Sequence, residues 1–221
     1  MNITIKEFRS LIKEFPIRKH SFDIKRKNWV VNNQDHIVEK IFDGKPVITL
    51  TRYDLINSSF DMEEFIIKVL MWGYPTKGRG KNIDKVLEPG NFKTLVDMLM
   101  KYQENDISID QLIQGIKTIN GLGLSTMTKF TNFLNIRING HKAVIFDARI
   151  IDALNSSRFE ELKSLTGINY HNKSRRYLDY IKVLDDLSKQ LDVESEQIEM
   201  FLFMFGKNLS EVLGENCYVY D

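Results

Sequence analysis

Apolar residues recur at helical spacing along most of the chain, and this periodicity constrains the fold more than any other feature. Near the start, apolar side chains share one helix face that Pro16 ends: Phe8, Leu11, Ile12 and Phe15. The same spacing recurs in residues 92–100, 109–119, 148–154, 175–191 and 197–205. Only residues 47–51 have the pattern of a short strand. The sequence predicts an all-α fold with two helical lobes and a cleft between them.

Capping residues and glycines place the ends of these helices. Asp61 and Glu64 form a capping pair before an almost wholly apolar segment, and Ser108 and Gln111 form another before the helix at 109–119. No repeat or long linker divides the chain. We expect an N-terminal helical segment at residues 1–60 with at most one short strand. A compact domain should follow at residues 61–221.

Composition limits the classes of function. The 221 residues carry 31 Lys and Arg against 30 Asp and Glu, so any contact with nucleic acid must come from a local patch or from main-chain amides. The single cysteine, Cys217, excludes an intramolecular disulfide and a cysteine-based iron–sulfur cluster. No apolar run approaches the roughly 20 residues that span a bilayer. We expect a cytoplasmic protein.

The stretch INGLGLSTMTKF, residues 119–130, places two glycines between two predicted helices. Gly121 and Gly123 permit positive φ and expose main-chain N–H groups at the start of the second helix. These amides and the helix dipole form a candidate phosphate site. The alternative is a plain turn between two antiparallel helices.

Asp147 follows the apolar run AVIF and directly precedes a helix, 24 residues after Gly123. A carboxylate in a water-poor cleft stabilises positive charge on a reacting sugar and can activate water. The alternative is a helix N-cap, and the two roles are compatible because capping anchors the side chain.

The hairpin together with this aspartate resembles the helix-hairpin-helix DNA glycosylase superfamily, which includes endonuclease III, the adenine mismatch glycosylases and the 8-oxoguanine glycosylases. Over residues 60–210 the chain is also similar to bacterial proteins with an 8-oxoguanine glycosylase fold, through MWGYPTKGRG and QIEMFLFMFG. The resemblance implies a DNA N-glycosylase that excises a damaged or modified base, with Asp147 as its essential carboxylate. DNA would be the partner.

The resemblance also bears on the attacking group. Superfamily members that nick the backbone carry a lysine two residues after the second glycine, where this chain has Ser125. Serine there implies simple hydrolysis by water, and hence a monofunctional enzyme. Lys129 lies one helical turn further on the same face, so its amine could reach the same site and supply lyase activity. The alternative for Lys129 is an ordinary surface lysine.

Two further groups of residues are candidates for binding. The candidate DNA contacts are the hairpin residues Gly121, Gly123, Ser125 and Thr126, the aromatic Trp72 and Tyr74, and the basic Lys77, Arg79 and Lys81. Trp72 could instead belong to the core, and the basic residues could form a solvated loop. The resemblance implies a monovalent cation held by the carbonyls of Lys117, Ile119 and Leu122. We expect no other cofactor.

Two other classes of function stay open at this point. A non-catalytic DNA-binding hairpin module could serve a bacterial repair or anti-phage defence assembly with protein partners, and the near-neutral charge favours this class. A protein-interaction scaffold would have no affinity for DNA even at low salt. The presence of an aspartate, Asp147, at the position expected for the essential carboxylate favours the glycosylase over both of these classes.

Overall fold

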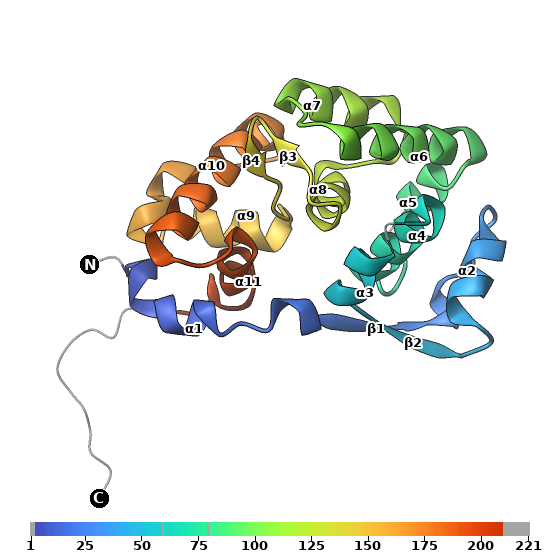
Figure 1. Cartoon of the computed structure of the whole chain (residues 1–221), viewed down its shortest axis with the longest axis horizontal. Helices are drawn as coiled ribbons and strands as arrows, with labels where there is room; N and C mark the ends of the chain where they lie inside the picture. Colours follow the sequence, from blue (N-terminus) through green and yellow to red (C-terminus); the bar gives the residue numbers. More distant parts are fainter. Residues whose placement is uncertain (1–2, 59, 79, 210–221) are drawn as a thin grey trace, which may run out of the picture.

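The computed structural model describes residues 3–58, 60–78 and 80–209, and helices dominate it (Figure 1). The first elements are α1 (Arg9–Lys13), β1 (Ser21–Lys25), α2 (Asp35–Phe42), β2 (Val47–Thr51), α3 (Arg52–Asn57), α4 (Met62–Gly73), α5 (Asn82–Val86) and α6 (Pro89–Glu104). They are followed by α7 (Ile109–Thr118), α8 (Leu124–Phe133), β3 (Arg137–Ile138), β4 (His141–Lys142), α9 (Ala148–Asn155), α10 (Lys173–Leu191) and α11 (Ser195–Phe205). Short 3₁₀ turns cover Ile5–Phe8, Ile17–Lys19, Arg26–Asn28 and Glu160–Leu165. The predicted all-α class is confirmed.

The capping residues begin their helices as the sequence predicted. Asp61 accepts a hydrogen bond from the Glu64 N–H at 3.1 Å and caps α4, while Ser108 and Gln111 form a reciprocal capping box on α7. Most of α4 is buried, and it packs against α2, α6 and α8. This helix therefore lies in the core, as expected from its apolar sequence.

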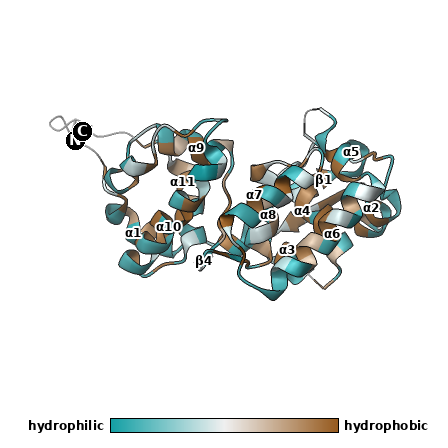
Figure 2. Ribbon diagram, turned by 90° about the horizontal axis from the view of Figure 1, so that it is seen from above, coloured by the Kyte–Doolittle hydropathy of each residue, from teal (hydrophilic) through white to brown (hydrophobic). Residues whose placement is uncertain are grey.

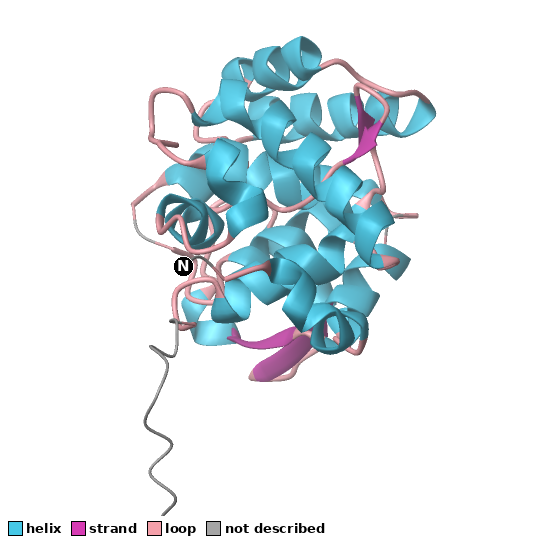
Figure 3. Ribbon diagram, turned by 90° about the vertical axis from the view of Figure 1, so that its left-hand side faces the viewer, coloured by secondary structure: helices cyan, strands magenta, loops and turns pink. Residues whose placement is uncertain are grey.

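The prediction of at most one strand in the first 60 residues is wrong. Val47–Thr51 does form β2, but Ser21–Lys25 forms a second strand that pairs with it antiparallel, from Ser21 opposite Thr51 to Lys25 opposite Val47. A single strand would leave its main-chain N–H and C=O groups without partners, so β2 requires β1. The sequence SFDIK alternates polar and apolar residues over only five positions, which is a weak pattern. Figure 3 shows the two strands at one edge of the molecule.

The helices gather in two groups in Figures 1 and 2. One group contains α1, α9, α10 and α11, and the other contains α2 to α8. Their apolar side chains join a single hydrophobic cluster, to which Ile12 of α1 and Ile24 of β1 both belong. The first 60 residues thus contribute to both groups, and the domain boundary at residue 60 stays a prediction.

Candidate active site

Lys129 is a buried residue, not the surface lysine that was one alternative from the sequence. It lies on α8, and only 5% of it is exposed. The aliphatic part of its side chain runs over Gly73, where a Cβ atom would lie 3.0 Å from Lys129 Cδ. Its Nζ donates to the carbonyl oxygen of Ser125 at 3.1 Å and to the Ser125 hydroxyl at 3.0 Å. Ser125 and Lys129 therefore form one unit on α8.

The surroundings of Lys129 favour its uncharged form. Burial lowers the pKa of the amine from its usual value of 10.5, while the carboxylates of Asp147 and Glu199 act in the opposite direction. Within the part of the chain that the structure describes, the hydrogen-bond partners of Nζ are the two neutral oxygens of Ser125. A buried lysine without a paired carboxylate is suited to act as an amine nucleophile.

Asp147 is the N-cap of α9. Its Oδ1 accepts hydrogen bonds from the N–H groups of Arg149 at 3.0 Å and Ile150 at 3.1 Å. Within the described ranges no hydrogen bond to Oδ2 occurs, which leaves this oxygen free for a substrate or water. The capping geometry expected from the sequence is thus present. The two hydrogen bonds to Oδ1 fix the position of the carboxylate, and they leave Oδ2 free.

The segment before Asp147 is buried and belongs to no helix or strand, and polar side chains hold its main chain in place. Thr128 Oγ1 accepts from the Phe146 N–H at 3.1 Å and itself donates to the Ser125 carbonyl at 3.2 Å. The other anchors are Asn132 Nδ2 to Ala143 O, Tyr177 OH to Val144 O and Tyr180 OH to Ile145 O, at 3.0, 3.0 and 3.2 Å. Side chains of α8 and α10 therefore position Asp147. Our sequence analysis identified none of these anchors.

Lys129 and Asp147 line the same cavity, whose volume is about 130 Å³. Its walls come from both groups of helices: His20, Phe22, Arg52, Trp72, Gly73, Lys129, Ile145, Asp147, Glu199 and Phe203. The structure thus brings together two of the three predicted catalytic residues, and the third, Ser125, is bonded to Lys129. Their catalytic roles stay predictions.

Arg52 and Glu199 form an ion pair in this cavity that the sequence analysis missed. Arg52 Nη1 lies 2.9 Å from Glu199 Oε2, and the side chains are 4% and 1% exposed. Burial raises the pKa of Glu199, and the guanidinium of Arg52 opposes that rise. The sequence did contain one hint, because Glu199 interrupts the apolar run of α11. Its partner is 147 residues away and could not be inferred.

Aromatic rings form another wall of the cavity. The ring of His20 lies 5.0 Å from Phe22, 5.3 Å from Trp72 and 5.7 Å from Phe203, measured between ring centroids. Burial first, and then the charges of Arg52 and Arg149, lower the pKa of His20 to about 4, so its ring is neutral near pH 7. Trp72 is 4% exposed, in agreement with the core alternative, but it also faces the cavity.

The hairpin between α7 and α8 leaves the start of α8 uncapped. Gly121 has a φ of 85°, and a Cβ there would lie 2.5 Å from the carbonyl oxygen of Asn82. Gly123 is the N-cap of α8, and as a glycine it has no side chain with which to cap the helix. Among the described residues, the N–H groups of Leu124 and Ser125 have no hydrogen-bond partner. These free amides are what a phosphate site requires.

A second cavity, of about 160 Å³, opens at this hairpin. It brings together most of the predicted DNA contacts, namely Gly121, Gly123, Ser125, Thr126, Tyr74 and Lys77, with Lys173 as an addition. The hydroxyl groups of Tyr74 and Thr126 are 2.7 Å apart. Trp72 faces the other cavity, Lys81 does not line this one, and Arg79 lies outside the described residues. DNA binding by these residues stays a prediction.

The proposed cation carbonyls belong to the same turn. Lys117 lies in the last turn of α7, where carbonyl oxygens lack partners within the helix, and Ile119 O accepts from the Leu122 N–H at 3.2 Å. These oxygens fit a monovalent cation in kind, and the cation itself stays a prediction. Within the described part of the chain, no group of three His, Cys, Asp or Glu side chains could hold a metal ion.

Comparison with known proteins identifies the family. Residues 16–203 match the model of the family described as "Putative 8-oxoguanine DNA glycosylase OGG-like protein". No curated protein and no solved structure matches the chain. None of the described helices is long and apolar enough to cross a membrane. The match covers most of the chain and confirms the resemblance first seen in the hairpin and Asp147. The chain therefore belongs to this OGG-like family of 8-oxoguanine DNA glycosylase relatives.

Proposed function

We propose that the protein is a DNA N-glycosylase in which Lys129 attacks the sugar and Asp147 stabilises the developing positive charge. The observation that carries this proposal is that a desolvated lysine and a carboxylate with a free oxygen line one small cavity. The match to an OGG-like glycosylase family supports the general function of a DNA glycosylase. The base it removes is damaged or modified.

The reaction uses the neutral amine of Lys129. Its lone pair forms a bond to C1′ of the deoxyribose while the N-glycosidic bond breaks, and the base leaves with the bonding electron pair. The ammonium proton released from Nζ passes to the departing base. Asp147 stabilises the positive sugar in this step. The lone pair of Nζ then expels O4′, which takes a proton from water, and the ring opens to a protonated Schiff base. Water hydrolyses this Schiff base, or β-elimination from it cleaves the strand.

Burial of Lys129 favours the amine over water as the attacking group. The sequence pointed to hydrolysis, because Ser125 stands where backbone-nicking relatives have lysine. Ser125 here accepts a hydrogen bond from Lys129, which supports a role in orienting the amine. Lyase activity through Lys129 is therefore part of the proposal, and monofunctional hydrolysis is the alternative that the experiment separates from it.

The two cavities suit two parts of one DNA substrate. A nucleotide must leave the stack to reach Lys129, and the rings of His20, Phe22 and Trp72 offer surfaces for its base. The free amides at the start of α8 would hold a phosphate of the same strand. Such main-chain contacts do not need a strong overall positive charge.

The test is a base-release assay on oligonucleotides that carry oxidised, deaminated, alkylated or hypermodified bases. We expect release by the wild type from one class of base, and loss of release in Asp147→Asn and Lys129→Ala. Lys182→Ala on α10 is the control, because Lys182 is exposed. Release that survives in Lys129→Ala but not in Asp147→Asn would support hydrolysis by water. Salt-sensitive DNA binding without release from any oligonucleotide would support the non-catalytic module.

A further inference from the structure

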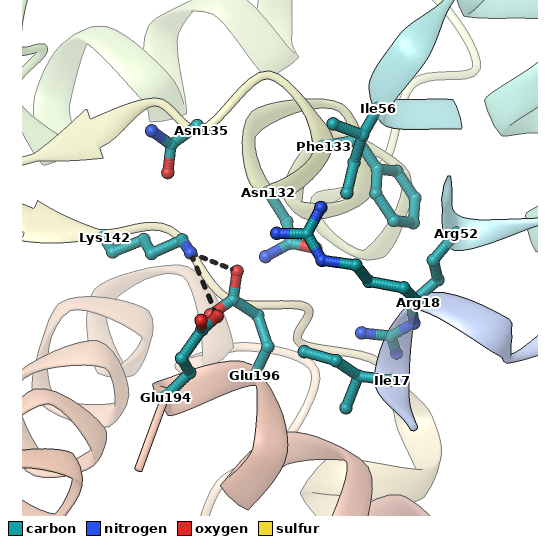
Figure 4. A pocket seen from close by; sticks show the side chains of 10 residues that line it. All are labelled: Ile17, Arg18, Arg52, Ile56, Asn132, Phe133, Asn135, Lys142, Glu194 and Glu196. Carbon is teal, nitrogen blue, oxygen red and sulfur yellow. Dashed lines mark ion pairs between the residues drawn. The ribbon is translucent and has the colours of Figure 1, made fainter. Parts of the chain in front are cut away.

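A third pocket, of about 310 Å³, lies at the other end of α8 (Figure 4). It is lined by Ile17, Arg18, Arg52, Ile56, Asn132, Phe133, Asn135, Lys142, Glu194 and Glu196. In Figure 4 the two arginines face Lys142 and the two glutamates across the pocket. Nothing in the proposed reaction uses this space.

The pocket is remote from the hairpin that we assign to DNA. The hairpin precedes Leu124, the first residue of α8, whereas Asn132, Phe133 and Asn135 lie at the end of this helix. Ten residues of α-helix span about 15 Å. A ligand in this pocket is therefore separate from the phosphates at the hairpin. Arg52, however, lines both this pocket and the cavity of Lys129.

Among the described residues, two buried polar atoms of the pocket find no hydrogen-bond partner. They are Oε2 of Glu196, whose side chain is 11% exposed, and Nε of Arg52, whose side chain is 4% exposed. Buried polar groups in folded proteins are almost always paired with protein, water or ligand. One atom is an acceptor and the other is a donor, and both lie just beneath the pocket surface, so pairing them with a ligand that presents an N–H group and an acceptor requires small movements of the two side chains.

Around the pocket the cations and the carboxylates are equal in number when Glu199 is included, but they are not evenly paired. Lys142 Nζ lies 2.5 Å from Glu196 Oε1 and 3.9 Å from Glu194 Oε2, and Arg52 is paired with Glu199. Arg18 is exposed, and within the described ranges it forms no ion pair or side-chain hydrogen bond. Its guanidinium is available for an anionic group, and phosphate is the group that its planar donors match well.

The remaining lining suits a flat ring. Ile17 and Phe133 offer apolar surface, and Asn135 offers an amide. Asn132 uses its Nδ2 to hold Ala143 and presents its carbonyl oxygen as a further acceptor. The volume lies at the lower end of the range for small-ligand sites.

We propose that this pocket binds a free nucleoside monophosphate. Its phosphate pairs with Arg18, and the edge of its base donates an N–H to Glu196 and accepts from Arg52. The ring packs against Phe133. The proposal goes beyond base excision, and it does not depend on the chemistry of Lys129.

Calorimetric titration of the full chain tests the proposal with four sets of ligands: the nucleoside 5′-monophosphates, the nucleosides, ribose 5-phosphate and inorganic phosphate. We expect one site per chain that binds a monophosphate more tightly than either its nucleoside or ribose 5-phosphate. Arg18→Ala should weaken the monophosphate about tenfold and leave the nucleoside unchanged. Glu196→Gln should weaken the monophosphate and the nucleoside by a similar factor and leave ribose 5-phosphate unchanged.

Arg175→Ala is the matched control, because Arg175 is an exposed arginine of α10 outside the pocket. Circular dichroism checks that each variant is folded. Absence of heat with every nucleotide would overturn the proposal. So would equal binding of monophosphate and inorganic phosphate, or binding that neither variant weakens. Since the titration requires no base release, its failure is distinguishable from failure of the glycosylase proposal.

Discussion

Replacing Thr128 with valine should loosen the segment that carries Asp147. Valine has nearly the shape of threonine, so the fully buried site stays filled. The change removes the acceptor for the Phe146 N–H and the donor to the Ser125 carbonyl. The Phe146 N–H has no other partner among the described residues, and the variant leaves it buried and unpaired.

The loss of stability expected for Thr128→Val follows from the unpaired Phe146 N–H. A buried donor left without an acceptor costs about 1–3 kcal/mol, and we expect the free energy of unfolding in urea to fall by that amount. Thr131→Val is the control, three residues further along the same buried helix. Thr131 donates to carbonyls of its own helix, at 3.2 and 3.3 Å, so its loss orphans no main-chain N–H and should cost less than about 1 kcal/mol.

The hydrogen-exchange rate of the Phe146 amide is the second measurement on this variant. In Thr128→Val its amide should exchange faster, and base release should slow because Asp147 is less firmly placed. Equal stability of the two variants, together with unchanged protection of the Phe146 amide, would refute the positioning role of Thr128.

Three further predictions follow from the site. Lys129→Met should raise the free energy of unfolding at pH 7, because a buried amine is replaced by an apolar group. In the wild type, the rate of base release should rise with pH and level off below pH 10.5, because burial lowers the pKa of Lys129. A rate that still rises above pH 10.5 would contradict the lowered pKa. The folded protein should lose stability as the pH falls from 6.5 towards 4, because unfolded His20 binds a proton more readily than the folded residue, and His20→Phe should flatten this slope in urea titrations. Gly121→Ala should destabilise the fold by more than about 1 kcal/mol, because φ is positive there and the added Cβ would meet Asn82. Gly123→Ala, where the space is open, should change the stability by less than about 0.5 kcal/mol. Similar unfolding midpoints for the two variants would count against the close packing of the hairpin.

Local signals in the sequence predicted the local elements. The capping aspartate and apolar run predicted α4, and the glycines predicted the hairpin before α8. The strand at residues 47–51 was predicted with its correct bounds. Each of these features depends on residues within a few positions of one another, so periodicity and capping are sufficient to find them.

Features that depend on distant contacts could not be predicted. Burial of Lys129 requires both groups of helices to close around α8, and no spacing within STMTKF indicates that. The pair of Arg52 and Glu199 joins positions far apart in the chain. Residues 144–146, directly before Asp147, take hydrogen bonds from side chains of α8 and α10, which no local pattern indicates. The site is thus a product of tertiary packing around a hairpin that the sequence did indicate.

In the proposed reaction Lys129 forms a covalent bond with the sugar. Borohydride reduction during reaction with a substrate oligonucleotide, followed by proteolysis and mass spectrometry, tests it most directly. We predict a stable protein–DNA adduct whose modified peptide carries the sugar on Lys129, and no adduct in Lys129→Ala. Release of the base without any trapped adduct, or an adduct on another lysine, would contradict the assignment of Lys129 as the nucleophile.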